Sequence, residues 1–563
     1  MNPLAPVPAS AVRLRNPGPA RRVVESCLDR CEETGRIRNF AVAAGLATGE
    51  FVGRRYDDSD VYKTLEGAAA FPDLHPRAAE IARIVVAAQQ PDGYLNTYYT
   101  LVEPSRRWVD LKSSHELYCL GHLIEAACAF GGGPLMDAAS RFLELVEREF
   151  GPGRREDPPG HQEIELALLR LARNTGESRW RDLSRFFLER RGRGENRPRY
   201  GEYAQDHLPV HEQHEAVGHA VRALYMYCAM AEHEGLLPAA IAAFGDILGR
   251  KAYVTGGVGS RGEIEGFGEP YDLPVENAYC ETCAAIALAM LARRLLLGTW
   301  DSRYADAYEL ILRNAVLAGV SLSGDRFFYA NPLRTGGEHE RVSWFHCACC
   351  PTNLARFLPQ LPGDLYAVSA DTLFVAQYAA GEAVADLAGT RVTIVQETGY
   401  PFSGAVRLRI DPGTETEFTL ALRIPGWCAG PVGASVSGRP LGAITGPAWL
   451  RIPRQWRAGD EVMLRLPLVP RRVPGRREVK AERGLVALRY GPLVYCLEGA
   501  DNPGDPREGV LPPAAPLVAD FVPDLLGGAT VLTAGTDPPL IAVPYALWGN
   551  RSPGPMTVWV REK

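Results

Sequence analysis

The chain has 563 residues, of which 46% are hydrophobic and 23% charged, an ordinary globular composition that suggests about three domains. Its formal net charge is −6, from 61 Lys and Arg against 67 Asp and Glu. Phosphate binding needs a concentrated positive patch, so this balance argues against a nucleic-acid partner. We expect no membrane partner, because no apolar run looks long enough to span a bilayer. The N-terminus lacks the apolar stretch of a secretory signal, so we expect a cytoplasmic protein.

The pattern is helical up to about residue 360. Apolar residues recur three and four apart in segments such as VVESCLDRCEE, RAAEIARIVVAAQQ, HELYCLGHLIEAACAF and CAAIALAMLARRLLLG. That spacing is typical of helices that bury one face. A long succession of such helices favours pairs arranged as a toroid, and a right-handed solenoid would show the same pattern.

The pattern changes after Gly363. Short segments with alternating apolar residues follow, among them TLFVAQYA, RVTIVQETG, AVRLRIDP, EFTLALRIPGW and LVALRYGPLVYCLE. Alternation with turn signals between segments predicts antiparallel sheet. The expected architecture is an α + β multidomain chain: a helical domain at 16–362, a β-sandwich at 363–470 to which 1–15 contributes a strand, and a second β-sandwich at 471–563.

A cysteine cluster stands out in SWFHCACCPTN, which contains Cys347, Cys349 and Cys350 among the 12 cysteines of the chain. In a large chain without an export signal, such a cluster indicates metal binding or catalysis rather than disulfides. Pro351 favours the first turn of a helix, which places the vicinal pair at a helix N-terminus. The helix dipole there favours thiolate over thiol. The alternative is that these cysteines are small buried residues.

A second segment, NAYCETCAAIALAMLARR, supplies further ligand types. It predicts a helix that begins around Ala284, with Glu281 and Cys283 in the turn that enters it. In that turn the two side chains can converge, and with Cys349 and Cys350 they would complete a tetrahedral zinc shell. Soft sulfur ligands favour zinc or iron–sulfur over magnesium or calcium. The alternative is a helix N-terminal glutamate beside a core cysteine.

Several segments, spread from about residue 20 to about residue 500, together resemble glycoside hydrolase family 127, the β-L-arabinofuranosidase family. They are DSDVYKTLEGAA, QQPDGYLNTYY, HELYCLGHLIEAA, PGHQEIELAL, EAVGHAVRALY, YVTGGVGSRGEIEGFGEPYDLPVENAYCETCAA, FHCACCPTN and RGLVALRYGPLVYCLE. The resemblance implies an (α/α)6 barrel catalytic domain followed by β-sandwich domains, a zinc ion and a cysteine nucleophile.

The resemblance also implies a role for each candidate residue. Cys349 is expected to be the nucleophile and a zinc ligand, and Cys350, Glu281 and Cys283 are expected to be ligands only. Glu265 is expected to be the acid/base. The histidines expected to contact the sugar are His115, His161 and His219, and His122 is an alternative because it shares a helical face with His115.

This chain departs from the family pattern in places that leave alternatives open. It has Gly262-Glu263-Ile264-Glu265-Gly266-Phe267 where the family usually has G-E-x-F, so Glu263 and Glu269 are rival acids. The first helix lacks an expected glutamine, for which Cys27 is a candidate replacement. Other expectations are that aromatic groups stack on a sugar or pack in the core, namely Trp344-Phe345, Tyr94 and Tyr98-Tyr99, and that the charged run RRGRGENRPR from Arg190 is a solvated loop.

The leading hypothesis is a retaining exo-glycosidase that removes a terminal β-L-arabinofuranosyl residue from an oligosaccharide or glycoconjugate. A relative that acts on another branched or acidic sugar is the close alternative within the enzyme class. A non-catalytic carbohydrate-binding protein with a structural zinc is the alternative from a different class. A homodimer stays open.

Overall fold

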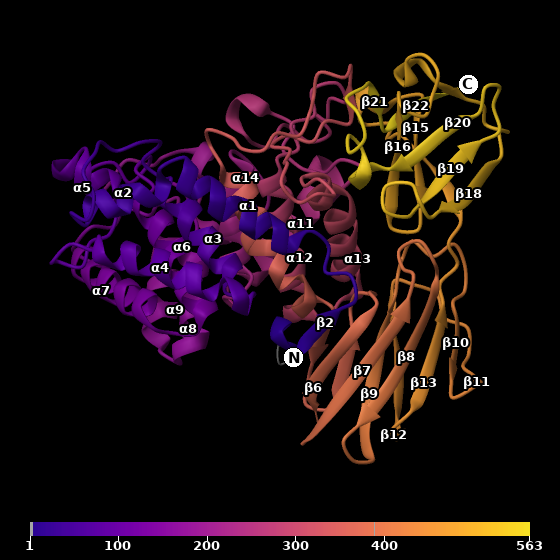
Figure 1. The fold of residues 1–563 in the computed structure, drawn as a ribbon, viewed down its shortest axis with the longest axis horizontal. Helices are drawn as coiled ribbons and strands as arrows, with labels where there is room; N and C mark the ends of the chain where they lie inside the picture. The colour runs from indigo at the N-terminus through magenta and orange to yellow at the C-terminus, as the bar shows by residue number, and fades with distance from the viewer. Residues whose placement is uncertain (1–3, 388) are drawn as a thin grey trace.

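The computed structural model describes residues 4–387 and 389–563, and helices dominate its first part (Figure 1). Amphipathic spacing of apolar residues accounts for these helices. They are α1 (Ala20–Glu33), α2 (Arg36–Ala43), α3 (Asp58–Ala68), α4 (His75–Ala87), α5 (Tyr98–Leu101), α6 (Glu116–Phe130), α7 (Pro134–Glu149), α8 (Ile164–Thr175), α9 (Ser178–Glu189), α10 (Ala220–Met230), α11 (Leu237–Asp246), α12 (Thr282–Thr299), α13 (Ser302–Ile311) and α14 (Cys349–Phe357).

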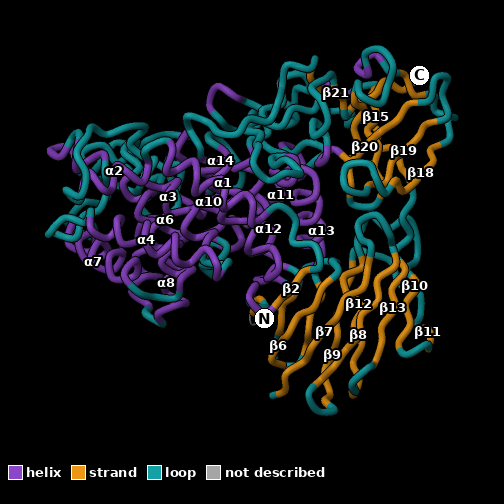
Figure 2. Tube along the Cα trace, in the orientation of Figure 1, coloured by secondary structure: helices purple, strands orange, loops and turns teal. Residues whose placement is uncertain are grey.

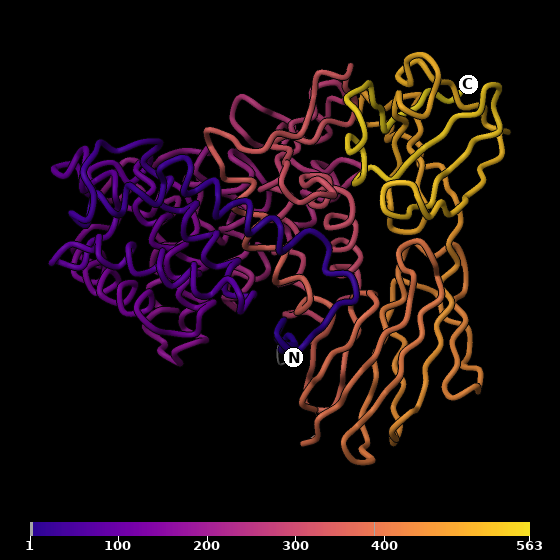
Figure 3. The backbone as a smooth tube through the Cα atoms, in the orientation of Figure 1, coloured from indigo at the N-terminus to yellow at the C-terminus, as the bar shows by residue number. Residues whose placement is uncertain are grey.

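The first β-region has two sheets that share one apolar core. One sheet has the order β1 (Ala5–Pro6), β4 (Tyr366–Val368), β5 (Thr372–Val375), β9 (Thr416–Ile424) and β12 (Ala448–Trp456). The other has the order β11 (Arg439–Pro440), β10 (Gly433–Val436), β13 (Asp460–Arg465), β8 (Ala405–Pro412), β7 (Thr390–Thr398), β6 (Gly381–Leu387) and β2 (Val12–Leu14). The N-terminal segment therefore contributes a short strand to each sheet (Figure 3).

The second β-region is a ten-stranded sheet. Its main order is β17 (Val510–Leu511), β22 (Trp559–Glu562), β15 (Leu485–Tyr490), β16 (Leu493–Glu498), β20 (Leu540–Pro544), β19 (Ala529–Ala534) and β18 (Leu517–Val522). Off this path, β14 (Pro470–Pro474) pairs with β15, and β21 (Met556–Thr557) pairs with both β16 and β3 (Arg334–Thr335). Because β3 precedes α14 in the chain, this sheet extends to the helical part.

The predicted order of a helical part followed by β-regions is confirmed. The expectation of purely antiparallel sheets is wrong at two pairs, because β5 runs parallel to β9 and β17 runs parallel to β22. The toroidal arrangement of helix pairs and the two sandwiches stay predictions.

Helix α12 is a long apolar element of the helical core. By length and hydropathy it would pass for a membrane span, contrary to our expectation from the sequence, but 72% of it is buried inside the protein. It packs against α10, α13 and α14. Nearby, α3 and α14 approach closely at Gly67, where a Cβ atom would lie 2.2 Å from the carbonyl oxygen of Ala355. Any side chain larger than hydrogen at Gly67 would therefore push α3 away from α14, the helix that begins with Cys349 and Cys350.

Buried polar contacts join the β-regions to the helices. Arg423 on β9 is fully buried and pairs with Asp306 at 2.5 Å and Glu309 at 2.9 Å, both on α13. A buried arginine is stable only when its charge is compensated in this way. From the second β-region, the Tyr545 hydroxyl donates to the carbonyls of Asn331 and Pro332 at 3.1 and 3.0 Å.

Candidate active site

The structure brings the four predicted metal ligands together. One ligand atom from each of Glu281, Cys283, Cys349 and Cys350 lies within 4.8 Å of the others. The Cys283 and Cys350 sulfurs are 3.4 Å apart, and those of Cys349 and Cys350 are 3.9 Å apart. A Glu281 carboxylate oxygen lies 3.8 Å from the sulfurs of both Cys349 and Cys350.

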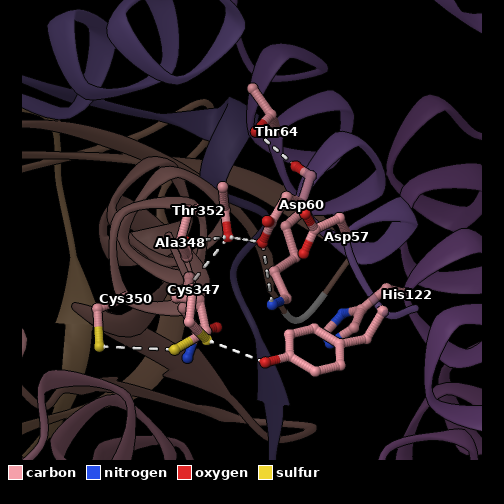
Figure 4. A network of polar contacts seen from close by, with 12 residues as sticks. Asp57, Asp60, Thr64, His122, Cys347, Ala348, Cys350 and Thr352 are labelled. Atoms are coloured by element: carbon pink, nitrogen blue, oxygen red, sulfur yellow. Dashed lines mark hydrogen bonds and ion pairs between the residues drawn. The ribbon is translucent and has the colours of Figure 1, made fainter. Parts of the chain in front are cut away.

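The cysteine pair lies at the N-terminus of α14, as the sequence predicts. Residues of α3 stabilise the turn that precedes α14. The Thr352 hydroxyl donates to the Asp60 carboxylate at 3.0 Å and to the Ala348 carbonyl at 2.9 Å (Figure 4). Arg36 donates to Asp60 at 3.0 Å and to the His346 carbonyl at 3.1 Å. These buried, charge-assisted contacts keep the helix start in one position.

Glu281 is the N-cap of α12, which begins at Thr282, slightly earlier than the predicted start near Ala284. The Thr282 hydroxyl donates to the Phe328 carbonyl at 2.8 Å, and its amide donates to the Tyr329 carbonyl at 2.9 Å. The side chain of Asn331 donates to the Cys280 carbonyl and the Thr282 hydroxyl, each at 2.9 Å. The second β-region therefore supports the entrance to α12 through its contact with Asn331.

The cluster fits a zinc ion. Ligands of a tetrahedral zinc with bonds of about 2.0–2.3 Å lie about 3.4–3.8 Å apart, close to the separations seen here. Burial, followed by the neighbouring Cys349 sulfur, raises the pKa of the Glu281 carboxyl well above its ordinary value. Its second oxygen is buried without a hydrogen-bond partner in the described structure. A bound dication would compensate this concentration of acidic groups.

The cluster forms one wall of a cavity of about 200 Å³. This volume is below the about 300–1,000 Å³ of drug-sized ligand sites and suits a single small sugar unit. All three histidines predicted to contact the sugar line it, together with Glu265, Glu281, Cys283 and Cys349. Its tyrosines are Tyr56, Tyr118, Tyr203, Tyr225 and Tyr329. Figures 1 and 2 show long loops, rather than helices, where the helical part lies next to the second β-region.

Of the three candidate acids, Glu265 lines the cavity. It accepts hydrogen bonds from the Tyr279 hydroxyl at 3.0 Å and the Tyr329 hydroxyl at 3.1 Å, and it lies 3.2 Å from the His219 ring. The His219 contact, with smaller contributions from both tyrosines, lowers the pKa of Glu265 to about 2, although burial opposes this. Its backbone is left-handed, with φ 49°, a conformation that costs a non-glycine residue energy and that recurs at functional sites.

The rival acids face elsewhere. Glu263 is 61% exposed and pairs with Arg261 at the surface, and Glu269 is also exposed. Neither lines the cavity. The short 3-10 turn Gly262–Ile264 is followed by the left-handed Glu265, so the carboxylates of Glu263 and Glu265 point in different directions. The structure therefore favours Glu265 as the acid/base, and its role stays a proposal.

Tyr329 connects the two candidate catalytic groups. Its hydroxyl donates to Glu265 at 3.1 Å and accepts from the Cys349 thiol at 3.3 Å. The sum of these distances is an upper limit for the separation of sulfur and carboxylate oxygen. That limit is compatible with the about 5–5.5 Å that separates the two carboxyl groups of retaining glycosidases.

The three histidines form a row along the cavity. The ring centroids of His115 and His161 are 5.6 Å apart, as are those of His161 and His219. Burial and the nearby Arg222 guanidinium lower the pKa of His115 to about 3 and that of His161 well below its ordinary value. Burial also lowers the pKa of His219. Neutral imidazoles both donate and accept hydrogen bonds, which suits uncharged sugar hydroxyls.

Several alternatives from the sequence do not lie at this cavity. His122 is fully buried behind Tyr118, with its ring 3.2 Å from Glu163. Cys27 and Tyr94 are fully buried. None of these residues lines the cavity, and neither do Tyr98, Tyr99, Trp344 and Phe345. Sequence reasoning missed Tyr203, Tyr279 and Tyr329, because tyrosine is common in helical cores and these three lie in loops without a local pattern.

The charged run 190–199 is not a fully solvated loop as expected. Arg191 is buried and pairs with Glu165 at 2.9 Å. Arg197 is buried and pairs with Asp206 at 2.7 Å. Asp206 also accepts from the backbone amides of Gly192 and Tyr200 at 2.6 and 2.7 Å. The expected loop is thus a buried ionic anchor for the segment that leads to Tyr203.

Asp206→Asn is expected to lower the free energy of unfolding of this segment by about 3–5 kcal/mol, because it leaves Arg197 buried without its counter-charge. Burial opposes ionisation, but hydrogen bonds from Arg197 and the two amides hold the pKa of Asp206 below its ordinary 3.8. A lowered pKa gives stability that is complete above pH 3.8 and lost as the pH falls through the folded value. The measurement is hydrogen–deuterium exchange of segment 191–206 at neutral pH and near pH 3.

At neutral pH the variant should exchange this segment much faster than wild type, and the difference should shrink at the lower pH. Asp386→Asn is the matched control, because Asp386 is 85% exposed and its partner Arg391 is 74% exposed. Equal exchange of segment 191–206 in wild type and Asp206→Asn at neutral pH would contradict the assignment.

Comparison with known proteins gives one family throughout. Residues 19–363 match the family model described as β-L-arabinofuranosidase, GH127 catalytic domain, residues 372–468 match the GH127 middle domain, and residues 470–561 match the glycoside hydrolase family 127 C-terminal domain. The chain is 33% identical to a non-reducing end β-L-arabinofuranosidase of Bifidobacterium longum subsp. longum, over 93% of this chain and 92% of that protein.

Solved structures agree. A GH127 β-L-arabinofuranosidase from Geobacillus stearothermophilus T6 is 38% identical and superposes with a TM-score of 0.92 over 98% of this chain and 100% of that one. Another GH127 β-arabinofuranosidase is 36% identical, with a TM-score of 0.95 over 100% of this chain and 98% of that one. The chain therefore belongs to glycoside hydrolase family 127, the β-L-arabinofuranosidase family, and is a glycoside hydrolase.

Proposed function

We propose that this hydrolase is a retaining exo-enzyme that removes terminal β-L-arabinofuranosyl residues from an oligosaccharide or glycoconjugate, with Cys349 as nucleophile and Glu265 as acid/base. The observation that carries the proposal is the pair of contacts from the Tyr329 hydroxyl to Glu265 and to the Cys349 sulfur. The small cavity supports removal of one sugar unit at a time. The names of the relatives support the choice of sugar.

In the first step, the Cys349 sulfur attacks the anomeric carbon, and the bond from that carbon to the leaving oxygen breaks. Glu265 gives its proton to that oxygen. The product is a thioglycoside on Cys349. Cys283 and Cys350 are buried, whereas Cys349 is part-buried, so Cys349 is the most accessible sulfur of the cluster and the one placed to react.

Glu265 has to acquire its proton as the substrate binds, because its lowered pKa leaves it ionised in the free enzyme at neutral pH. Its side chain is 40% exposed. A substrate that covers this surface removes water from the carboxylate, and desolvation raises the pKa of a carboxyl group. In the second step, the Glu265 carboxylate takes a proton from water, the hydroxide attacks the anomeric carbon from the opposite face, and the Cys349 thiolate leaves.

We propose that Glu281, Cys283, Cys349 and Cys350 hold zinc, which when bound keeps Cys349 deprotonated and in place. Cys350→Ser is expected to lower the zinc content from about one ion per chain to well below one, because a hydroxyl is a much poorer zinc ligand than a thiolate. The measurement is elemental analysis of dialysed protein. Cys428→Ser, in the first β-region, is the matched control and should keep its zinc. Full zinc in Cys350→Ser would contradict the ligand assignment.

The reaction is tested by offering an aryl β-L-arabinofuranoside to wild type and following the anomeric configuration of the released sugar by NMR. Release of the β-anomer first supports the retaining mechanism, and release of the α-anomer first contradicts it. Failure to cleave this and a wide panel of furanosides and pyranosides would favour a carbohydrate-binding protein with a structural metal. Cleavage of another sugar in that panel would support the alternative of a relative with a different substrate.

A further inference from the structure

We infer that Tyr203 forms the leaving-group subsite, a stacking platform for the sugar ring to which the terminal residue is attached. This inference rests on the proposed function. Tyr203 lines the cavity and is also 39% exposed. The other cavity tyrosines are less exposed; Tyr118 and Tyr225 are 6% and 1% exposed. Tyr203 therefore lies at the mouth, where a part of the substrate outside the cavity would meet it.

Neighbouring side chains pack against one face and one edge of the Tyr203 ring. The Arg222 guanidinium lies over one ring face, 4.7 Å from the centroid, and is itself buried. The His219 ring packs edge-on, with centroids 5.6 Å apart and an interplanar angle of 83°. The exposure of Tyr203 must then come from its second face and outer edge. A cation beneath an aromatic ring fixes its orientation, and the open face is free to cover the apolar face of a sugar.

The backbone under Tyr203 is rigid. The buried Gln205 amide donates to the Val217 carbonyl at 2.8 Å and also contacts the carbonyls of Tyr203 and His219. A Cβ atom on Gly218, which has φ +68°, would lie 2.1 Å from the Glu202 carbonyl oxygen. Glycine at this position therefore lets two loops pack directly. An exposed aromatic ring on so constrained a loop loses little entropy when a ligand binds to it.

The position of Tyr203 relative to the acid/base identifies what it binds. The acid/base must reach the oxygen between the terminal sugar and the leaving group. The His219 ring contacts both groups: it lies 3.2 Å from Glu265 and packs against the Tyr203 ring. The Ala220 amide donates to the Glu265 carbonyl at 3.0 Å, which joins the segment of His219 to the loop that carries Glu265. Tyr203 and Glu265 thus share the contact with His219 and lie together at the exposed part of the cavity, where the leaving group would meet Tyr203.

The test compares two substrates in wild type and Tyr203→Ala: methyl β-L-arabinofuranoside, whose leaving group has no ring, and a disaccharide of β-L-arabinofuranose linked to a second arabinose. We expect the ratio of kcat/KM for the disaccharide to kcat/KM for the methyl glycoside to fall about tenfold in Tyr203→Ala, mainly through KM, as a lost stacking contact predicts. Tyr203→Phe keeps the ring and should keep the ratio within about twofold.

Phe521→Ala is a matched control, because Phe521 is an aromatic side chain on β18 that is 55% exposed. Its ratio should equal that of wild type. Equal losses on both substrates in Tyr203→Ala, or no loss on either, would overturn the subsite assignment while leaving the proposed function intact. Failure of wild type to cleave either substrate would instead overturn the proposed function on which the subsite rests.

Discussion

Cys349→Ser is expected to lower kcat for an aryl β-L-arabinofuranoside by a factor of about 10⁴ or more, as removal of a covalent nucleophile does in other enzymes. Serine is nearly isosteric but is protonated at neutral pH and a weak nucleophile without an adjacent base. The position also matters physically, because Cys349 is the part-buried member of the cluster and reaches both the cavity and Tyr329. The measurement is steady-state hydrolysis together with mass spectrometry of enzyme quenched during turnover.

Wild type quenched during turnover should carry one pentosyl group on the peptide that contains Cys349, and Cys349→Ser should carry none. Cys428→Ser, again the control, should retain wild-type kcat, because Cys428 lies in the first β-region outside the cavity. The variant should keep some zinc through Glu281, Cys283 and Cys350, so elemental analysis separates loss of the nucleophile from loss of the metal. Full activity in Cys349→Ser would refute covalent catalysis by this sulfur.

Glu265→Gln is expected to lower kcat by about 10²–10⁴-fold, because an amide neither gives a proton to the leaving oxygen nor takes one from water. The loss should be smaller in the first step for an aryl leaving group, which departs without a proton. The second step should then limit turnover, and the thioglycoside should accumulate. Stopped-flow measurement of the released aryl alcohol should show a burst followed by slow turnover, and azide should restore turnover by replacing the activated water.

The neighbouring carboxylates provide matched controls for this prediction. Glu263→Gln and Glu269→Gln make the same chemical change within four residues of Glu265, but both side chains are exposed outside the cavity. Both variants should keep kcat within about twofold of wild type, as surface substitutions usually do. A larger loss in either variant than in Glu265→Gln would move the acid/base role to that residue.

Residues with left-handed backbone lie at both ends of the loop between the candidate acid/base and the proposed metal site. Glu265 and Cys280 both have positive φ, at 49° and 42°, and flank the loop that ends at the proposed metal ligand Glu281. Non-glycine residues adopt this conformation at a cost, which the surrounding hydrogen bonds offset. Contacts from Asn331 and, behind it, Tyr545 of the second β-region stabilise this loop. The C-terminal sheet therefore contributes to the geometry of the site without lining the cavity.

Local chemistry made much of this site predictable. Vicinal cysteines before a proline indicate thiols at a helix N-terminus, and α14 begins at Cys349. A glutamate and a cysteine two positions apart at a helix start can direct their side chains to the same site. Glu281 is indeed the N-cap of α12. Helical and strand periodicity also predicted the order of the regions, because side-chain burial repeats at the period of the element. Which residues are able to bind a metal, and where their helices begin, thus depend on residues that are neighbours in the sequence.

Other features depended on contacts between distant segments. The spacing of Glu263, Glu265 and Glu269 in the sequence does not show which carboxylate faces the cavity. A turn that ends in a left-handed residue decides this. The charged run at Arg190 looked solvated until Glu165 and Asp206 supplied buried partners.

The sequence by itself determined which residue types are available for chemistry: four candidate metal ligands at two helix starts, and candidate carboxylates and histidines for a sugar. Only the tertiary structure decided which of them meet, since Cys349 and Glu265 are 84 positions apart in the printed sequence and are joined through Tyr329. The physical reason is that ligand type and helix capping are local properties, whereas burial, desolvation and the facing of side chains arise from packing between segments.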